Sequence, residues 1–284
     1  MLLFRRRRRL LRLLLCAMCA APVIAVAQDP AASYPNKPVT LIVPYAAGGS
    51  SDARARQVAE KISRYLGQQV IVDNKPGGNG NIGTGMIARA TPDGYVIGMG
   101  NLAPLTVNRA LTPQTMSFDP EADLVPVALL ERGPLVLVVN QDKSPYKNLN
   151  ELMAALKAKP GKMSYASAGS GGAFHLAGEL FKANGGVYSV HIPYRGGGPA
   201  INDLLAGQVD YMFEMLPSAM PYLKSSPAKM RPLAVAHEKG LASLPHVRVV
   251  VRPPSTSARL ASASDDRDRA AIRGAALHAT RARA

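Results

Sequence analysis

The fold is indicated by residues 39–67, which read VTLIVPYAAGGSSDARARQVAEKISRYLG. The first five residues are apolar or β-branched, which is typical of a buried strand. The segment 52–66 places apolar side chains on one helical face, with Ser50 or Ser51 as the predicted N-cap and Gly67 just past the helix end. A glycine-rich turn joins strand to helix, so this stretch predicts an α/β fold built from parallel strands.

Similar strand–loop–helix units follow along the chain, in one series up to residue 99 and a second series from residue 135. Two series of this kind predict two lobes. We expect strands at 39–43, 70–73, 95–99, 135–140, 163–167, 188–192 and 209–213, and helices at 81–90, from 149 to a stop at Pro160-Gly161, at 173–184 and at 199–206.

The strong positive charge does not indicate a nucleic-acid-binding protein. The 284 residues carry a formal net charge of +15, of which +6 lies in residues 1–27 and +5 in residues 248–284. Residues 28–247 therefore carry only +4, which is an ordinary solvated surface. With 47% hydrophobic residues the chain can form a substantial core.

The N-terminus is typical of a secretory signal peptide. The arginine run 5–9 precedes an apolar stretch that ends in Ala25-Val26-Ala27, so we expect cleavage after Ala27 and export of the mature protein. The alternative, a membrane anchor, is disfavoured because Arg12 leaves fewer than ~20 continuous apolar residues. Cys16 and Cys19 both lie inside this segment, so no disulfide is expected in the mature protein.

Three glycine-rich loops, 47–52, 76–81 and 168–172, follow predicted strands and precede predicted helices. Such a loop can present unpaired backbone N–H groups at the positive end of a helix, which favours anion binding. A single loop of this kind could equally be a tight turn. Three loops on two lobes shift the prediction towards ligand binding, and His175, just after the third loop, either touches the ligand or packs.

Other chemistries find little support. Residues 78–83 spell G-x-G-x-x-G, but the strand that follows does not end in the acid that a dinucleotide site requires. Ser170 does not lie in a G-x-S-x-G motif, and the five histidines have no metal-ligand spacing. We therefore expect no enzyme activity, no cofactor and no metal, with an exported esterase or a nucleic-acid binder as the alternatives to test.

Several segments carry a resemblance to a known family. They read YPNKPVTLIVPYAAGGSSD (34–52), VDNKPG (72–77), TPDGY (91–95), DLVPVA (123–128), HIPYRG (191–196) and DLLAGQVD (203–210). In order and spacing this resembles the substrate-binding proteins of tripartite tricarboxylate transporters, the Bug receptors, over residues 33–247. The resemblance implies a two-lobed periplasmic-binding-protein fold, type II-like, that closes like a Venus flytrap on a small organic acid.

The resemblance also implies where the ligand carboxylate is held. Backbone N–H groups and water from one loop of each lobe would bind it, and the residue after the family's strand near 213 helps to select the far end of the ligand. The implied residues are Tyr45, Ala47, Gly48, Gly49, Ser50, Ser51 and Asp52 in lobe one, Ser167, Ala168, Gly169, Ser170 and Gly171 in lobe two, and Glu214, which stands where the family often has Asp. His175 is a further candidate from its place after the third loop alone.

The resemblance divides the chain into a signal peptide (1–27), a first lobe segment (28–131), a second lobe (132–235), a return to the first lobe (236–247) and an atypical Ala/Arg-rich tail (248–284). The tail lacks the family's later motifs and reads as disordered or frameshifted. We therefore expect the C-terminal part of lobe one to be missing or replaced, and this chain to fold poorly or bind weakly.

The expected function is capture of a carboxylate for a tripartite tricarboxylate-type transporter. Two alternatives stay open: a ligand sensor without a transport role, and a non-functional truncated family member. The expected partners are the organic acid and the membrane components of the transporter. We expect a monomer that does not bind nucleic acid.

Overall fold

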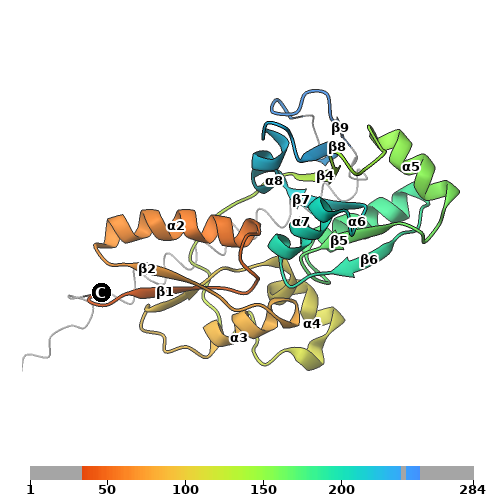
Figure 1. The fold of residues 1–284 in the computed structure, drawn as a ribbon. Coiled ribbons are helices and arrows are strands. Elements are labelled where there is room, and N and C mark those ends of the chain that lie inside the picture. Colours follow the sequence, from red (N-terminus) through yellow and green to blue (C-terminus); the bar gives the residue numbers. More distant parts are fainter. Residues whose placement is uncertain (1–33, 238–240, 250–284) are drawn as a thin grey trace, which may run out of the picture. The chain divides into compact units, whose positions relative to one another are not determined.

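The strands of the computed structural model form two separate sheets (Figure 1). The structure describes residues 34–237 and 241–249. Residues from Lys37 onward belong to one unit of the chain and those up to Asn36 to another, and the description below concerns the first of these. The predicted signal peptide, its cut after Ala27 and residues 250–284 of the tail lie outside the described residues.

The first sheet has three parallel strands in the order β2-β1-β3. The chain leaves the central strand β1 in one direction to reach β2, then crosses back over it to reach β3. Right-handed crossovers in opposite directions place their helices on opposite faces, and Figure 1 shows α2 and α3 on the two sides of this sheet. The elements are β1 (Val39–Val43), α2 (Ser50–Leu66), β2 (Val70–Asn74), a short helix η2 (Gly78–Gly80), α3 (Asn81–Ala88) and β3 (Val96–Gly98).

Helix α2 packs on this sheet through small side chains. Ala55 and Ala59 are buried against Val39, Leu41 and Val43 of β1. The helix ends at Gly67 in the left-handed conformation, with φ 67°, which confirms the predicted C-cap.

The predicted N-cap of α2 is wrong by one residue. The helix begins at Ser50, and extended Gly49 is the N-cap without a side-chain capping bond. Asp52 in the first turn accepts a hydrogen bond from the Gly48 N–H at 2.9 Å, so the acid ties the preceding loop to the helix start, much as the acid of a capping box reaches back.

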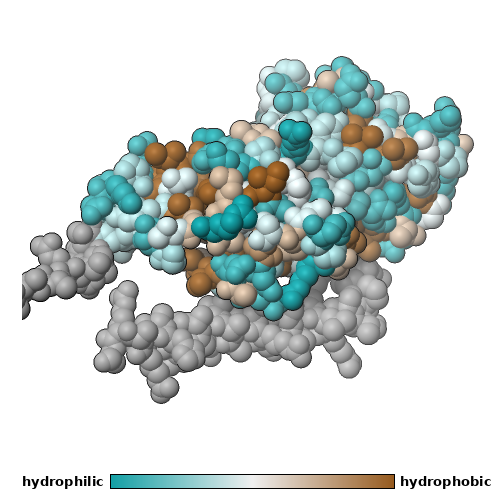
Figure 2. Space-filling model, turned by 90° about the horizontal axis from the view of Figure 1, so that it is seen from below, coloured by the Kyte–Doolittle hydropathy of each residue, from teal (hydrophilic) through white to brown (hydrophobic). Residues whose placement is uncertain are grey.

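The connection between the lobes is largely irregular. It contains η3 (Ala103–Val107), α4 (Asn108–Leu111) and η4 (Pro113–Thr115), and has no assigned strand between residues 116 and 134. Arg54 of α2 holds its far end through an ion pair with Glu131, with Nε 2.9 Å from Oε2. Residues 125–130 (VPVALL) are all exposed, with Val125 86% and Val127 91% accessible. Figure 2 shows several separate hydrophobic areas on one face of the molecule.

The second sheet has the strand order β6-β5-β7-β4-β8-β9. Its first three strands repeat the arrangement of the first sheet, with β5 in the place of β1. The strands are β4 (Leu135–Asn140), β5 (Ser164–Ser167), β6 (Val190–Pro193), β7 (Tyr211–Met215), β8 (Met230–Ala236) and β9 (Arg248–Val249), and the helices are α5 (Leu149–Ala158), α6 (Ala173–Gly185), α7 (Gly197–Ala206) and α8 (Leu216–Leu223).

Strand β4 corrects the expectation of parallel strands throughout. It runs antiparallel to both neighbours, β7 and β8. Two parallel strands that follow one another along the chain must be joined by a crossover connection. The chain instead reaches β4 from the irregular connection between the lobes, which imposes no parallel direction. It is also the sheet's most buried strand: Val136, Leu137, Val138 and Val139 are fully buried, with successive side chains on opposite faces.

Residues 241–249 lie with the second lobe. Leu241 and Leu244 pack against its buried cluster around Val136 and Ile201, and β9 pairs with β8 in parallel. The predicted return of residues 236–247 to the first lobe therefore differs from the structure. The edge strand β8 has backbone N–H and C=O groups available for pairing, and they supply hydrogen-bond partners for the backbone of β9.

Candidate functional site

Two glycine-rich loops occupy equivalent places in the two sheets. One follows β1 and the other follows β5. The next two strands along the chain, β2 and β3 or β6 and β7, lie on opposite sides of the strand that each loop follows. In α/β sheets ligands bind beyond the carboxyl ends of the strands at such switch points. The residues predicted from the sequence therefore lie at the two places where this topology favours binding.

The loop of the first lobe folds onto the start of α2. The Asp52 carboxylate accepts from the Gly48 N–H and lies 3.0 Å from the Arg56 guanidinium. Burial alone would raise the pKa of Asp52, but hydrogen bonds from Arg56, Gly48 and Asn74 lower it overall. Asp52 is thus an ionised anchor for the loop. Ala47 and Gly48 are exposed on its rim, while Ser50 and Ser51 supply first-turn N–H groups without an acceptor inside the helix.

Tyr45 supports this loop from within the core. Its side chain is buried with Val43 and Val39, and burial raises the pKa of its hydroxyl well above the usual range. Its carbonyl accepts a hydrogen bond from the Asn74 amide at 3.0 Å. Tyr45 therefore fixes the end of β1 rather than presenting a charge.

The loop of the second lobe differs from the prediction of unpaired donors. The Gly169 N–H donates to Ser167 Oγ at 3.2 Å, the Ser170 N–H to Asn79 Oδ1 at 3.1 Å, and the Gly171 N–H to His175 Nδ1 at 3.1 Å. Ala168 is partly buried. His175 thus packs against the loop as a hydrogen-bond acceptor. The sequence could not show these pairings, because all three acceptors are side-chain atoms and one of them, Asn79 Oδ1, is 91 positions away from Ser170.

A polar network lies beneath this loop. Ser167 Oγ is 2.6 Å from His191 Nε2, and the ring centroids of His175 and His191 are 4.2 Å apart. Burial, with a contribution from His175, lowers the pKa of His191 to about 4, and burial also lowers that of His175. The two rings are therefore neutral at pH 7, as their close contact requires.

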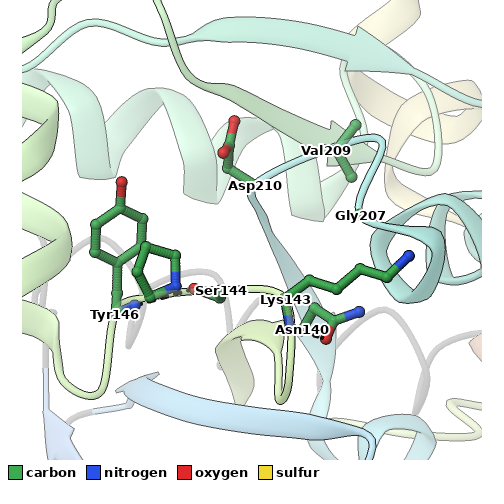
Figure 3. A pocket seen from close by; sticks show the side chains of 8 residues that line it. Asn140, Lys143, Ser144, Tyr146, Gly207, Val209 and Asp210 are labelled. Carbon is green, nitrogen blue, oxygen red and sulfur yellow. Dashed lines mark hydrogen bonds between the residues drawn. The ribbon is translucent and has the colours of Figure 1, made fainter.

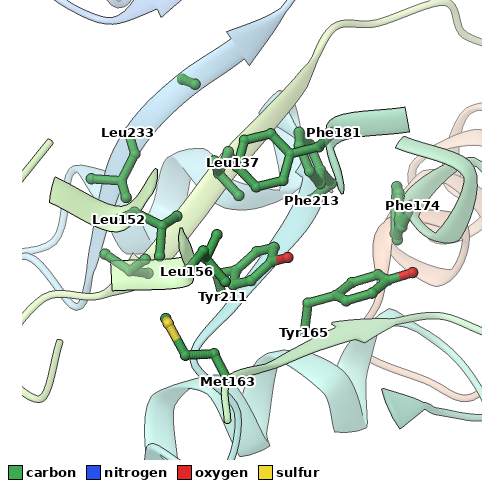
Figure 4. Packing of buried hydrophobic residues seen from close by; sticks show 12 residues of the cluster. Leu137, Leu152, Leu156, Met163, Tyr165, Phe174, Phe181, Tyr211, Phe213 and Leu233 are labelled. Atoms are coloured by element: carbon green, nitrogen blue, oxygen red, sulfur yellow. The ribbon is translucent and has the colours of Figure 1, made fainter. Parts of the chain in front are cut away.

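The same network is joined to the aromatic core of the lobe. The Tyr165 hydroxyl donates to Glu179 at 2.5 Å, and Lys182 Nζ lies 2.7 Å from the same carboxylate. Figure 4 shows Tyr165 and Tyr211 among the buried side chains of this cluster. Although Ser167 and His191 have the spacing of a nucleophile and base, Ser167 is fully buried and also bonds to Gly169, so the pair supports the loop.

The first-lobe loop lies directly against the start of α7. The Ala46 N–H donates to the Arg195 carbonyl at 2.9 Å. A Cβ on Gly49 would lie 2.9 Å from Gly197 N, and one on Gly198 would lie 2.1 Å from the Ala47 carbonyl oxygen. These contacts require glycine. The sequence signal that could have indicated them is the run Gly196–Gly198, which was not among the predicted site residues.

Glu214 of β7 lies at the same junction. Its side chain is fully buried, Oε1 accepts from the Met215 N–H at 3.0 Å, and Oε2 has no hydrogen-bond partner. A Cβ on Gly197 would be 3.3 Å from Oε2 and 3.7 Å from Ser50 N, and the nearby Ser50 side chain opposes the rise of the Glu214 pKa. Burial raises the pKa of Glu214 to about 8. The structure therefore brings the predicted residues Ser50 and Glu214 together, with Glu214 neutral at pH 7.

A small cavity elsewhere on the second lobe does not compete with this site. It has a volume of about 60 Å³ and is lined by Asn140, Lys143, Tyr146 and Asp210 among others (Figure 3). Ligand pockets typically measure ~300–1,000 Å³. Its charged groups are also engaged, since Lys143 Nζ donates to the Ala206 carbonyl and Asp210 accepts from the Ser164 N–H.

Among the described residues, no group of three or more His, Cys, Asp and Glu side chains could hold a metal ion. Within residues 34–237 and 241–249, no helix has the length and apolar character needed to cross a membrane.

Comparison with known proteins identifies the family. The model of the tripartite tricarboxylate transporter family receptors matches residues 54–261. A UPF0065 protein from the tcbD-tcbE intergenic region of Pseudomonas sp. strain P51 is 41% identical over 212 residues, which are 75% of this chain and 61% of that protein. Protein BugT of Bordetella pertussis is 39% identical over 217 residues, covering 76% of this chain and 64% of BugT.

Solved structures agree. An R. palustris protein with adipate is 33% identical with a TM-score of 0.72, covering 76% of this chain and 71% of that one. MatC from Rhodopseudomonas palustris with bound malate is 30% identical with a TM-score of 0.69, covering 76% and 72%. The chain thus belongs to the tripartite tricarboxylate transporter receptor family and has its two-lobed fold. This family consists of solute-binding proteins rather than enzymes. The chain spans 61–64% of the length of the first two relatives.

Proposed function

We propose that this protein captures a small organic acid between its two glycine-rich loops, in the periplasm, and delivers it to the membrane components of a tripartite tricarboxylate-type transporter. The observation that carries the proposal is a contact between the lobes: the start of α2, after the switch-point loop of the first sheet, lies against the start of α7, which follows β6, the neighbour of the switch-point strand β5 in the second sheet. Two helix N-termini favour a carboxylate by their dipoles and first-turn N–H groups.

The chemical class of the ligand is supported by charge. Within the described loops, the Asp52 carboxylate is already paired with Arg56, and Glu214 is neutral at pH 7. A ligand carboxylate would therefore meet backbone donors rather than an unpaired negative charge. The ligands named for the two related structures, adipate and malate, are both small organic acids.

The test is direct identification of a bound acid. Native mass spectrometry of the purified protein should detect a co-purifying acid of low mass, and titration calorimetry should show saturable binding of adipate or malate. Simple esters should not be hydrolysed, since Ser167 is buried. Absence of binding to a broad panel of mono-, di- and tricarboxylates would contradict the proposal.

Transport, sensing and assembly state need separate measurements. Deletion of the gene should abolish uptake of the identified acid if the receptor serves a transporter, and should leave uptake intact if it serves a sensor. Light scattering should give the mass of a monomer at micromolar concentration.

A further inference from the structure

The second glycine loop of the first lobe reaches across to the second lobe through one side chain. Asn79 Oδ1 accepts the Ser170 N–H at 3.1 Å. A Cβ on Gly169, whose φ is +129°, would lie 3.1 Å from the same oxygen. The second-lobe loop is therefore shaped around a carboxamide oxygen supplied by the first lobe.

The backbone of Asn79 is held in an uncommon conformation. With φ 52° and ψ 37° it is the one non-glycine residue with positive φ among the described residues, and its neighbours Gly78 and Gly80 also have positive φ. Asparagine tolerates this region better than most residues, but glycine is favoured there. The hydrogen bond that the Asn79 side chain accepts from Ser170 therefore explains why asparagine, rather than glycine, stands at this position.

A buried asparagine network fixes the loop in place. The Asn108 amide donates to the Asn79 carbonyl at 3.2 Å and to Asn81 Oδ1 at 2.7 Å. The Asn81 amide in turn donates to Thr115 Oγ1 at 2.9 Å. Asn81 and Asn108 are both buried. The backbone of Asn79 is thus held in place by buried residues of its own lobe and of the segment that follows it.

We propose that Asn79 is an internal competitor for the ligand: its carboxamide oxygen takes the Ser170 N–H that a ligand carboxylate oxygen would otherwise take, so that Asn79 sets the affinity. This inference rests on the proposed function. A carboxamide oxygen is the neutral counterpart of a carboxylate oxygen, and both accept from the same backbone donor. Binding then exchanges one hydrogen bond for another, which lowers the net gain for the ligand.

The test compares Asn79→Gly and Asn79→Asp with the parent protein, using adipate and malate as probes. Asn79→Gly keeps the positive φ and removes the competitor, so affinity should rise about two- to tenfold. Asn79→Asp places an ionised acceptor on the same N–H, so affinity should fall by at least that factor at pH 7. Gln69→Glu is the matched charge control, because Gln69 is exposed and directly precedes β2, at the opposite end of the first sheet.

A second measurement does not depend on a ligand. Amide hydrogen exchange followed by NMR should show faster exchange at Ser170 in Asn79→Gly than in the parent, by about fivefold or more. Unchanged exchange at Ser170, or weaker acid binding by Asn79→Gly, would overturn the inference while leaving the proposed function in place. If no acid of the broad carboxylate panel binds to any variant although Ser170 exchange responds, the proposed function fails and the competition fails with it.

Discussion

At the scale of single residues, Glu214 predicts how the stability of the folded state changes between about pH 4.5 and 8. Its pKa is raised by burial to about 8, against about 4.3 in an unfolded chain. The folded state therefore holds a proton that the unfolded state has lost, and stability should decrease as pH rises from about 4.5 to 8, by up to ~1.4 kcal/mol per pH unit. Glu214→Gln should remove this decrease in urea unfolding followed across pH 5–9.

The control for this experiment is Glu121→Gln, because the Glu121 side chain is exposed and its replacement should leave the slope unchanged. A parent protein with constant stability from pH 6 to pH 8 would show that Glu214 is ionised at low cost in the folded state.

His191 has the opposite effect on stability, which it lowers as the pH falls. Its pKa is lowered by burial, with a contribution from His175, to about 4, so the folded state keeps the ring neutral where the unfolded state binds a proton. The stability that this provides is present above about pH 6.5 and is lost as pH falls towards 4. His191→Gln should flatten the acid limb of thermal unfolding between pH 4 and 6.5. If the thermal stability of this variant falls as steeply between pH 6.5 and 4 as that of the parent, groups other than His191 cause the loss.

At the scale of elements, the contact between the first-lobe loop and α7 can be tested with one methyl group. A Cβ on Gly198 would lie 2.1 Å from the Ala47 carbonyl oxygen, so Gly198→Ala must force the two apart, although alanine favours the helix itself. We expect acid affinity to fall at least tenfold with little loss of thermal stability. Calorimetry and thermal unfolding measure the two effects.

Gly185→Ala is the matched control for that substitution. Gly185 ends α6, and its Cβ would meet only the flexible end of Met153 and the side chain of Val187, so binding should be unchanged. Equal affinity of Gly198→Ala and the parent would mean that the contact at α7 is not used when ligand binds.

The elements themselves were largely predictable from local pattern. Strand 135–140 has the predicted bounds, and the other predicted helices and strands lie within a few residues of those observed. The periodicity of apolar residues and the glycines that end each element depend on neighbouring residues, so the sequence shows them directly. The antiparallel direction of β4 and the hydrogen bond from Ser170 to Asn79 depend on distant partners, and no local pattern records them. The residues of the loops could therefore be predicted, but not which of their N–H groups are already paired.

At the scale of the whole molecule, the exposed run 125–130 predicts weak cooperativity and self-association. Four of its side chains, Val125, Val127, Leu129 and Leu130, are large, apolar and exposed. This extended segment has no strand partner among the described residues. Exposed apolar segments with free backbone groups are prone to associate, so we expect self-association at high concentration.

Replacing Val125 and Val127 together with threonine should therefore lower the fluorescence of a bound hydrophobic dye and reduce light scattering at high concentration, with unfolding unchanged within about 0.5 kcal/mol. Val138→Thr, at a fully buried position of β4, should instead destabilise the protein because it buries a hydroxyl. A sharp unfolding transition with no dye binding in the parent protein would mean that residues 125–130 are covered in solution. The apolar run would then be part of an interface rather than a cause of non-specific association.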